Sequence, residues 1–215
     1  MADVTIAQIF IGFTVLLFSL TVHEMAHAWV ADRFGDPTAR GLGRVSLNPL
    51  VHADPIGTVV FPLLAAFSGI PLIGWAKPVP VRVGRLRHPR RDAVLVAAAG
   101  PASNLGLAAG AAVALMLLPV TPVTIGQPNV SVPLASLCGR ALEINVLLAV
   151  FNMIPIPPLD GGNVLGGLLP VGLARQFDVL RPYGFLLIYA LMLSGGLTYL
   201  VEPPYRFLVS WLPTK

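Results

Sequence analysis

Long apolar stretches are the feature that most constrains how this chain can fold. Four stretches are long and apolar enough to cross a bilayer as helices of about 20 residues, at residues 6–28, 93–118, 134–154 and 183–201. Only 11% of the residues are charged, whereas a soluble domain carries roughly 25%. The chain therefore lacks the charge that a water-facing surface needs. We expect an all-α polytopic membrane protein with about four full transmembrane helices, folded as one domain over residues 1–215.

Two further segments depart from this simple pattern. Residues 56–75 are apolar, but glycines and prolines at positions 57, 62, 69, 71 and 74 interrupt them. This composition predicts a broken or re-entrant segment rather than a straight span. Between Ala39 and Leu47, polar and apolar residues alternate, which predicts a small β-hairpin at the membrane surface.

Basic residues are concentrated in one loop. Six of the fourteen lie between Ala76 and Asp92, and the positive-inside rule places such a loop on the cytoplasmic side. The net charge of +4 then reflects topology and contact with lipid head groups, and we expect no nucleic-acid partner. The chain is expected to be a multi-pass protein of the cell membrane with both termini outside. The sequence leaves its oligomeric state open.

The first apolar stretch ends in an H-E-x-x-H motif, His23-Glu24-Met25-Ala26-His27. On a helix, residues four apart share a face, so both imidazoles can reach one Zn²⁺, with Glu24 beside it as a general base. Chance is the alternative explanation, because these residues are common on soluble surfaces. In a membrane span, however, each ionisable group costs about 2 to 3 kcal/mol, so the group should face a protein interior or a wet cavity. This context favours a metal site.

A catalytic zinc site keeps three protein ligands, so a third ligand must come from elsewhere in the chain. Asp160 is the main candidate. It follows prolines that end a predicted span, and a Gly161-Gly162 pair lets the backbone turn directly after it. An Asp-Gly pair is also common at ordinary turns. Its place at the membrane boundary favours a ligand.

These motifs resemble those of the site-2 proteases, membrane-embedded zinc metalloproteases that cut substrates within or near their transmembrane segments. The resemblance rests on H-E-x-x-H in the first span, on AGPASN at residues 99–104, and on an N-x-x-P-x-x-x-L-D-G motif made of Asn152, Pro155, Leu159, Asp160 and Gly161. It implies that His23, His27 and Asp160 hold one zinc ion per chain and that Glu24 activates water. It also implies membrane-protein substrates with a transmembrane helix and a role in regulated intramembrane proteolysis. The chain is similar to the compact branch of the family, without a PDZ or CBS domain.

Three more polar residues are candidates for the site. The family resemblance implies that Asn152 positions substrate or stabilises an oxyanion, and the alternative is a hydrogen bond between helices. Asn104 could donate to a substrate carbonyl or bond a neighbouring helix. His52 could line the site, or it could be an ordinary loop histidine at the interface.

The expected reaction is zinc-assisted hydrolysis of a peptide bond, with Glu24 accepting the proton of the attacking water. The same nitrogen and oxygen ligands also suit Co²⁺. A helical substrate must be unwound before attack, and strand addition at residues 39–47 could hold the unwound segment. The alternative function is a membrane transporter, or a proton or metal pathway, that uses the intramembrane His, Glu and Asp. The sequence shows no internal repeat that would support it.

Overall fold

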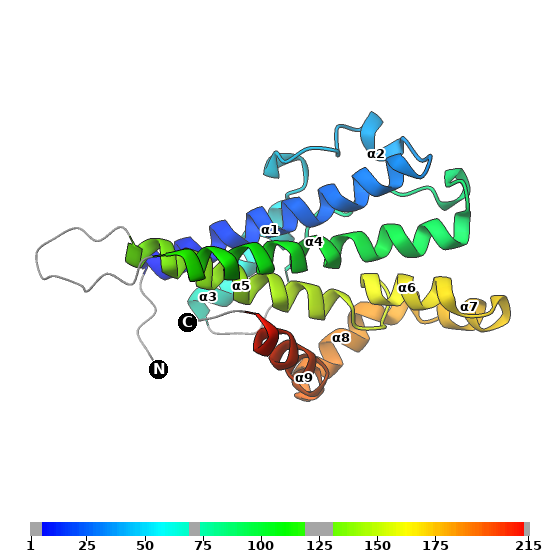
Figure 1. Cartoon of the computed structure of the whole chain (residues 1–215). Coiled ribbons are helices and arrows are strands. Elements are labelled where there is room, and N and C mark those ends of the chain that lie inside the picture. The colour runs from blue at the N-terminus through cyan, green and yellow to red at the C-terminus, as the bar shows by residue number, and fades with distance from the viewer. Residues whose placement is uncertain (1–5, 69–73, 119–130, 213–215) are drawn as a thin grey trace, which may run out of the picture.

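The computed structural model describes residues 6–68, 74–118 and 131–212, which form a bundle of helices (Figure 1). Its centre is made of α1 (Ile6–Arg33), α4 (Pro89–Leu117) and α5 (Ser131–Asn152). These helices lie side by side, and α4 packs against both α1 and α5 (Figure 1). Each is long and apolar enough to cross a membrane. Three of the four predicted spans are therefore confirmed.

Small residues of α4 form the contact with α5. Ala108 and Ala112 are completely buried against Val146 and its neighbours on α5. Small side chains allow two helix backbones to approach closely, which is how helices associate in a medium as apolar as their own side chains. Large apolar side chains such as Phe10 and Phe18 are instead exposed on the outside of the bundle, where lipid would solvate them.

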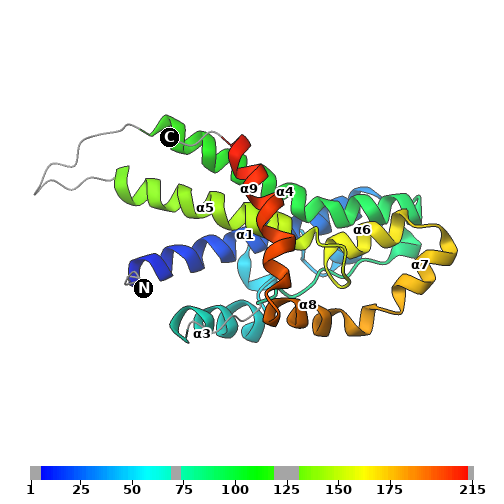
Figure 2. The ribbon, with the colours of Figure 1, turned by 90° about the horizontal axis from the view of Figure 1, so that it is seen from below.

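The fourth predicted span is not one straight helix. It is divided between α8 (Gly184–Leu193) and α9 (Gly196–Trp211), and the chain bends by 84° between residues 171–193 and 196–211. Gly195 at the bend has a φ of 74°, a conformation that glycine adopts without strain. α9 then crosses over α4 and α5 and packs on their core (Figure 2). Within the described residues, the expectation of four full helices is corrected to three helices and one bent pair.

The two described ends of the interrupted segment 56–75 lie together. It begins with the π-helical turns of η2 (Pro55–Val60) and continues as α3 (Phe61–Ser68), while residues 69–73 lie outside the described part. The two ends meet where Trp75 N donates to Gly57 O at 3.0 Å and Thr58 Oγ1 donates to Trp75 O at 2.8 Å. A re-entrant segment requires such a meeting of its ends.

The predicted β-hairpin at residues 39–47 is wrong. The described residues contain no β-strand, and this segment instead holds the short helix α2 (Thr38–Gly41). Asp36 accepts hydrogen bonds from the Thr38 amide and hydroxyl at the start of α2. At its end Gly43, with φ 69°, donates to Arg40 O while Arg44 N donates to Ala39 O. These hydrogen bonds begin and end a helix. The alternation of polar and apolar side chains therefore does not produce strands here.

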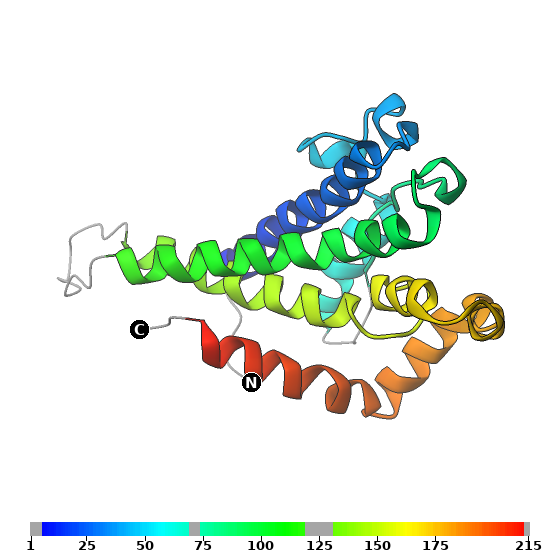
Figure 3. The same ribbon diagram turned by 45° about the vertical axis from the view of Figure 1, so that its right-hand side comes forward.

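The remaining elements gather at one end of the bundle. The carboxyl end of α1, the amino end of α4, and the helices α6 and α7 all lie at this end, and α6 packs against α4 (Figures 1 and 3). These short elements are η1 (Pro49–Val51), η3 (Val83–Arg85), α6 (Asp160–Leu168), α7 (Val171–Asp178) and η4 (Arg181–Tyr183). Segments far apart in the sequence therefore meet at this end.

Asp36 connects the turn after α1 to the loop before α4. It is fully buried and accepts hydrogen bonds from the Thr38 amide at 3.1 Å and the Arg82 amide at 2.6 Å. Burial raises the pKa of the Asp36 carboxyl, but these hydrogen bonds outweigh burial and hold the pKa below its ordinary value. The stabilisation is therefore present above the ordinary pKa of about 3.9 and is lost as the pH falls through the lower folded value.

We expect Asp36→Asn to lower the free energy of unfolding at pH 7 by about 1 to 3 kcal/mol, because a neutral amide accepts these bonds less well. The difference in Tm between wild type and variant should narrow as the pH is lowered below about 4. Thermal unfolding of the detergent-purified proteins between pH 3 and 7 measures it. Asp178→Asn, at an exposed carboxylate, is the control. A difference that stays constant with pH would contradict this account.

Candidate metal centre

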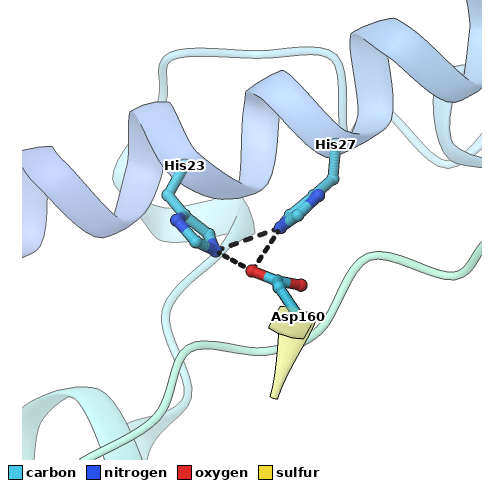
Figure 4. Close-up of side chains that lie close together, drawn as sticks. All are labelled: His23, His27 and Asp160. Atoms are coloured by element: carbon cyan, nitrogen blue, oxygen red, sulfur yellow. Dashed lines mark hydrogen bonds and ion pairs between the residues drawn. The ribbon is translucent and has the colours of Figure 1, made fainter. Parts of the chain in front are cut away.

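Three potential metal ligands converge between α1 and α6. His23 and His27 lie one turn apart on the same face of α1 and are buried, with 4% and 8% of their surface exposed. Asp160, the first residue of α6, points at both rings (Figure 4). Its Oδ2 lies 3.1 Å from His23 Nε2 and 3.3 Å from His27 Nε2, and the two Nε2 atoms are 3.0 Å apart. The structure thus brings together the three residues that the motifs predicted as ligands.

The loop between α5 and α6 places Asp160. Residues 153–159 fold back against the start of α6 and include a cis peptide bond between Pro157 and Pro158. A Cβ at Gly161 would overlap the Met153 carbonyl, and one at Gly162 would overlap the backbone around Pro157. Only glycine allows the loop and the first turn of α6 to approach so closely. The glycine pair in the motif therefore has a packing function as well as a turning function.

Groups from α4 fix the orientation of both imidazole rings. His23 Nδ1 lies 2.6 Å from Asn104 Oδ1, and His27 Nδ1 lies 2.7 Å from the Val96 carbonyl oxygen. Both partners are oxygens that can only accept, so each Nδ1 carries the hydrogen and donates it. In the neutral rings each Nε2 then presents a lone pair toward Asp160. Metal-bound histidines almost always have such a partner on the second nitrogen.

The donor set fits a divalent cation. Two imidazole lone pairs and a carboxylate oxygen face one another, and among the described residues Asp160 Oδ2 has no hydrogen-bond donor. Three acceptors at this separation repel one another unless a positive charge lies between them. Tetrahedral ligands about 2.0 to 2.1 Å from an ion would lie about 3.3 Å apart, close to the distances between these atoms. Two nitrogens and one oxygen are a common zinc donor set.

Gly100 of α4 makes room for this cluster. A Cβ at this position would lie within 2.5 Å of the Nε2 atoms of both His23 and His27. Any larger residue would therefore enter the space in front of the ligand atoms. The backbone of α4 forms one wall of the centre.

A cavity of about 1240 Å³ opens beside the three ligands. Glu24 lies in its wall, and Glu24 Oε2 accepts a hydrogen bond of 3.1 Å from the Val79 amide. Arg90 and Arg181 also line this cavity, together with the aromatic side chains of Trp75 and Phe185. The cavity therefore offers an acidic group near the ligands, apolar walls and cationic groups.

The other predicted site residues are divided between the cavity and the protein interior. Asn152 lines the cavity, and its Nδ2 donates to the Leu148 carbonyl at 2.9 Å. Asn104 does not line the cavity but lies behind His23, completely buried. His52 is also outside the cavity lining, and its Nε2 lies 2.9 Å from the Ser46 carbonyl oxygen.

Sequence reasoning did not find two groups that shape the centre. They are the Val96 carbonyl, which orients His27, and the Val79 amide, which holds Glu24. Both are backbone groups, so no residue type in the sequence indicates them. Gly100 did carry a signal, as part of the AGPASN motif.

Comparison with known proteins identifies the family. The model of peptidase family M50 matches residues 11–137, which include both histidines and Glu24. YwhC of Bacillus subtilis, named "putative zinc metalloprotease", is 37% identical over 188 residues, which make up 87% of this chain and 82% of YwhC. Two proteins of the same description named Rip2 are also similar. That of Mycolicibacterium smegmatis is 32% identical over 182 residues, and that of Mycobacterium tuberculosis H37Rv is 33% identical over 183; each match covers 84% of this chain and 66% of the relative.

No solved structure matches the chain significantly. The family and the relatives all indicate a peptidase, and nothing in them supports the transporter alternative. The apolar helices of the bundle agree with a protein that resides in a membrane. The chain therefore belongs to peptidase family M50, the site-2 protease family of intramembrane zinc metalloproteases.

Proposed function

We propose that His23, His27 and Asp160 hold one zinc ion per chain, with which the protein hydrolyses peptide bonds within or near transmembrane segments of other membrane proteins. The observation that carries this proposal is the convergence of three potential ligand atoms beside a cavity inside an apolar bundle. Ionisable groups in such a position carry a free-energy cost, so their presence there indicates a functional site.

Bound zinc would lower the pKa of a water molecule toward about 7 and polarise the carbonyl of the scissile bond. Glu24 is the general base of this proposal. The Val79 amide holds one oxygen of its carboxylate, and the other oxygen can accept the proton of the attacking water. The protonated Glu24 can then pass that proton to the leaving amine.

The substrate would be a membrane protein whose helix is locally unwound at the cleavage position. Carbonyl groups in a helix accept hydrogen bonds from residues four positions later and are shielded from attack. The cavity of about 1240 Å³ is large enough for several residues of extended chain, and its apolar walls suit segments from a membrane. Asn152 in the cavity wall has a second N–H that could bind a substrate carbonyl.

The active site would face the cytoplasm, with the protein in the cell membrane. Arg82, Arg85, Arg87, Arg90 and Arg91 precede or begin α4, at the end of the bundle where α6 carries Asp160 (Figure 1). The positive-inside rule assigns a loop of this charge to the cytoplasmic side.

The proposed chemistry is tested with purified wild type, Glu24→Gln and Asp160→Ala on a model transmembrane substrate. Wild type should hold about one zinc and cleave. Glu24→Gln should keep zinc and lose about 10²- to 10⁴-fold in kcat, the usual contribution of a general base. Asp160→Ala should lose zinc. Glu143→Gln, at a half-exposed carboxylate of α5, should behave as wild type.

Two outcomes would contradict these assignments. Cleavage at the wild-type rate by Glu24→Gln would remove Glu24 as the base. Full zinc retention by Asp160→Ala would remove Asp160 as a ligand.

Gly100→Ala tests whether the wall of α4 leaves room for the metal. The added methyl group would overlap the ligand atoms of both histidines, so the zinc Kd should rise by at least about tenfold, the smallest change typical of groups next to metal ligands. Gly106→Ala and Gly110→Ala make the same change on α4 where nothing lies within 4 Å. Chelator competition measures the Kd of each variant. Equal Kd values for all three would disprove the close approach.

The proposed orientation is tested by cysteine labelling in right-side-out membrane vesicles. The native Cys138 is first replaced by serine, and Arg85→Cys or Val132→Cys then supplies one exposed thiol at opposite ends of the bundle. A membrane-impermeant maleimide should label Val132→Cys in sealed vesicles and Arg85→Cys only after detergent is added. Labelling of Arg85→Cys in sealed vesicles would reverse the orientation.

A further inference from the structure

A chain of buried polar side chains connects His23 to three helices. His23 Nδ1 donates to Asn104 Oδ1 on α4, and Asn104 Nδ2 donates to Asn145 Oδ1 on α5 at 2.8 Å. Asn145 Nδ2 in turn donates to Ser19 Oγ on α1 at 2.9 Å and to the Ala141 carbonyl at 2.8 Å. Asn104, Asn145 and Ser19 are each at most 1% exposed. The three spans thus meet at a polar network directly behind the metal centre.

The network has only one consistent direction. Both N–H groups of Asn145 are used, by Ser19 and Ala141, so its Oδ1 must face Asn104. Asn104 must then present its NH₂ group to Asn145 and its oxygen to His23. A flip of the Asn104 amide would place Asn104 Oδ1 against Asn145 Oδ1, and two acceptors repel each other. Asn104 Nδ2 also donates to the Ser19 carbonyl, but at 3.5 Å rather than 2.8 Å. Asn145 is therefore the nearer of the two groups that fix which atom of Asn104 faces the imidazole.

This orientation determines the tautomer of His23. An oxygen opposite Nδ1 requires the hydrogen on Nδ1 and leaves the lone pair on Nε2, which faces His27 and Asp160. An Asn104 amide turned the other way would present N–H to Nδ1. The hydrogen of the neutral ring would then move to Nε2, where it would block a ligand position.

We propose that Asn145, held by Ser19, is a positioning residue for the metal centre. It acts through Asn104 to keep His23 in the tautomer that binds zinc. This inference rests on the proposed zinc site. It differs from a purely structural role, in which Asn145 would join α5 to α1 and α4 without any effect on the affinity for the ion.

The test measures the zinc Kd of the detergent-purified full chain by chelator competition, together with the Tm of the zinc-free protein. Asn104→Leu should raise the Kd by about 10- to 100-fold, the usual effect of removing the partner of a metal-binding histidine. Asn145→Leu, of similar shape, should raise it by about tenfold. In the double variant the Kd should be no higher than in Asn104→Leu alone, because Asn145 acts only through Asn104.

Two further variants keep the test decisive. Ser19→Ala removes one hydroxyl and should raise the zinc Kd between about twofold and tenfold. This smaller change supplies a result if Asn145→Leu does not fold. Thr21→Val removes another buried hydroxyl of α1, one that donates to the Leu17 carbonyl of its own helix at 2.7 Å. Its Kd should remain that of wild type.

Three results would overturn the inference. A lowered Tm of zinc-free Asn145→Leu with an unchanged zinc Kd would show a structural role only. Effects of Asn104→Leu and Asn145→Leu that add in the double variant would show that Asn145 does not act through Asn104. A wild type that binds no zinc would overturn the proposed metal site itself, and with it this inference.

Discussion

A polar side chain inside an apolar helix bundle must find a partner within the protein, because lipid offers none. The centre of this molecule follows from that constraint. Asn104, Asn145 and Ser19 pair with one another, and each histidine Nδ1 pairs with an oxygen of α4. At the centre, what remains are the two Nε2 atoms and one carboxylate oxygen. In the described part of the chain, the bundle thus leaves together a set of atoms that a metal ion can satisfy.

Local patterns in the sequence predicted much of this arrangement. Three spans follow from apolar length alone, and the ligand pair follows from the i, i+4 spacing of His23 and His27, which any helix would bring to one face. Asp160 was found because prolines and glycines mark the turn around it. Each of these signals lies within a few residues of the feature that it predicts, so no knowledge of the tertiary structure was needed.

The sequence could not predict features that depend on contacts between distant segments. The alternation at residues 39–47 indicated strands, but Asp36 and Gly43 begin and end a helix there, with Asp36 also bonded to the distant Arg82 amide. The bend at Gly195 was missed because hydropathy is averaged over a whole span. In the sequence, Asn145 is a single polar residue in an apolar stretch. Its position behind His23 follows only from its contact with Asn104.

The two histidines are held by chemically different partners. His23 depends on a side chain, Asn104, whereas His27 depends on the main-chain oxygen of Val96. A substitution can remove or replace the amide of Asn104, but no substitution at position 96 deletes a peptide carbonyl. Genetic variation can therefore tune the basicity and orientation of one ligand while the other stays constant. Replacing a hydrogen-bond partner by substitution can therefore change the orientation of His23, but the same route is closed for His27.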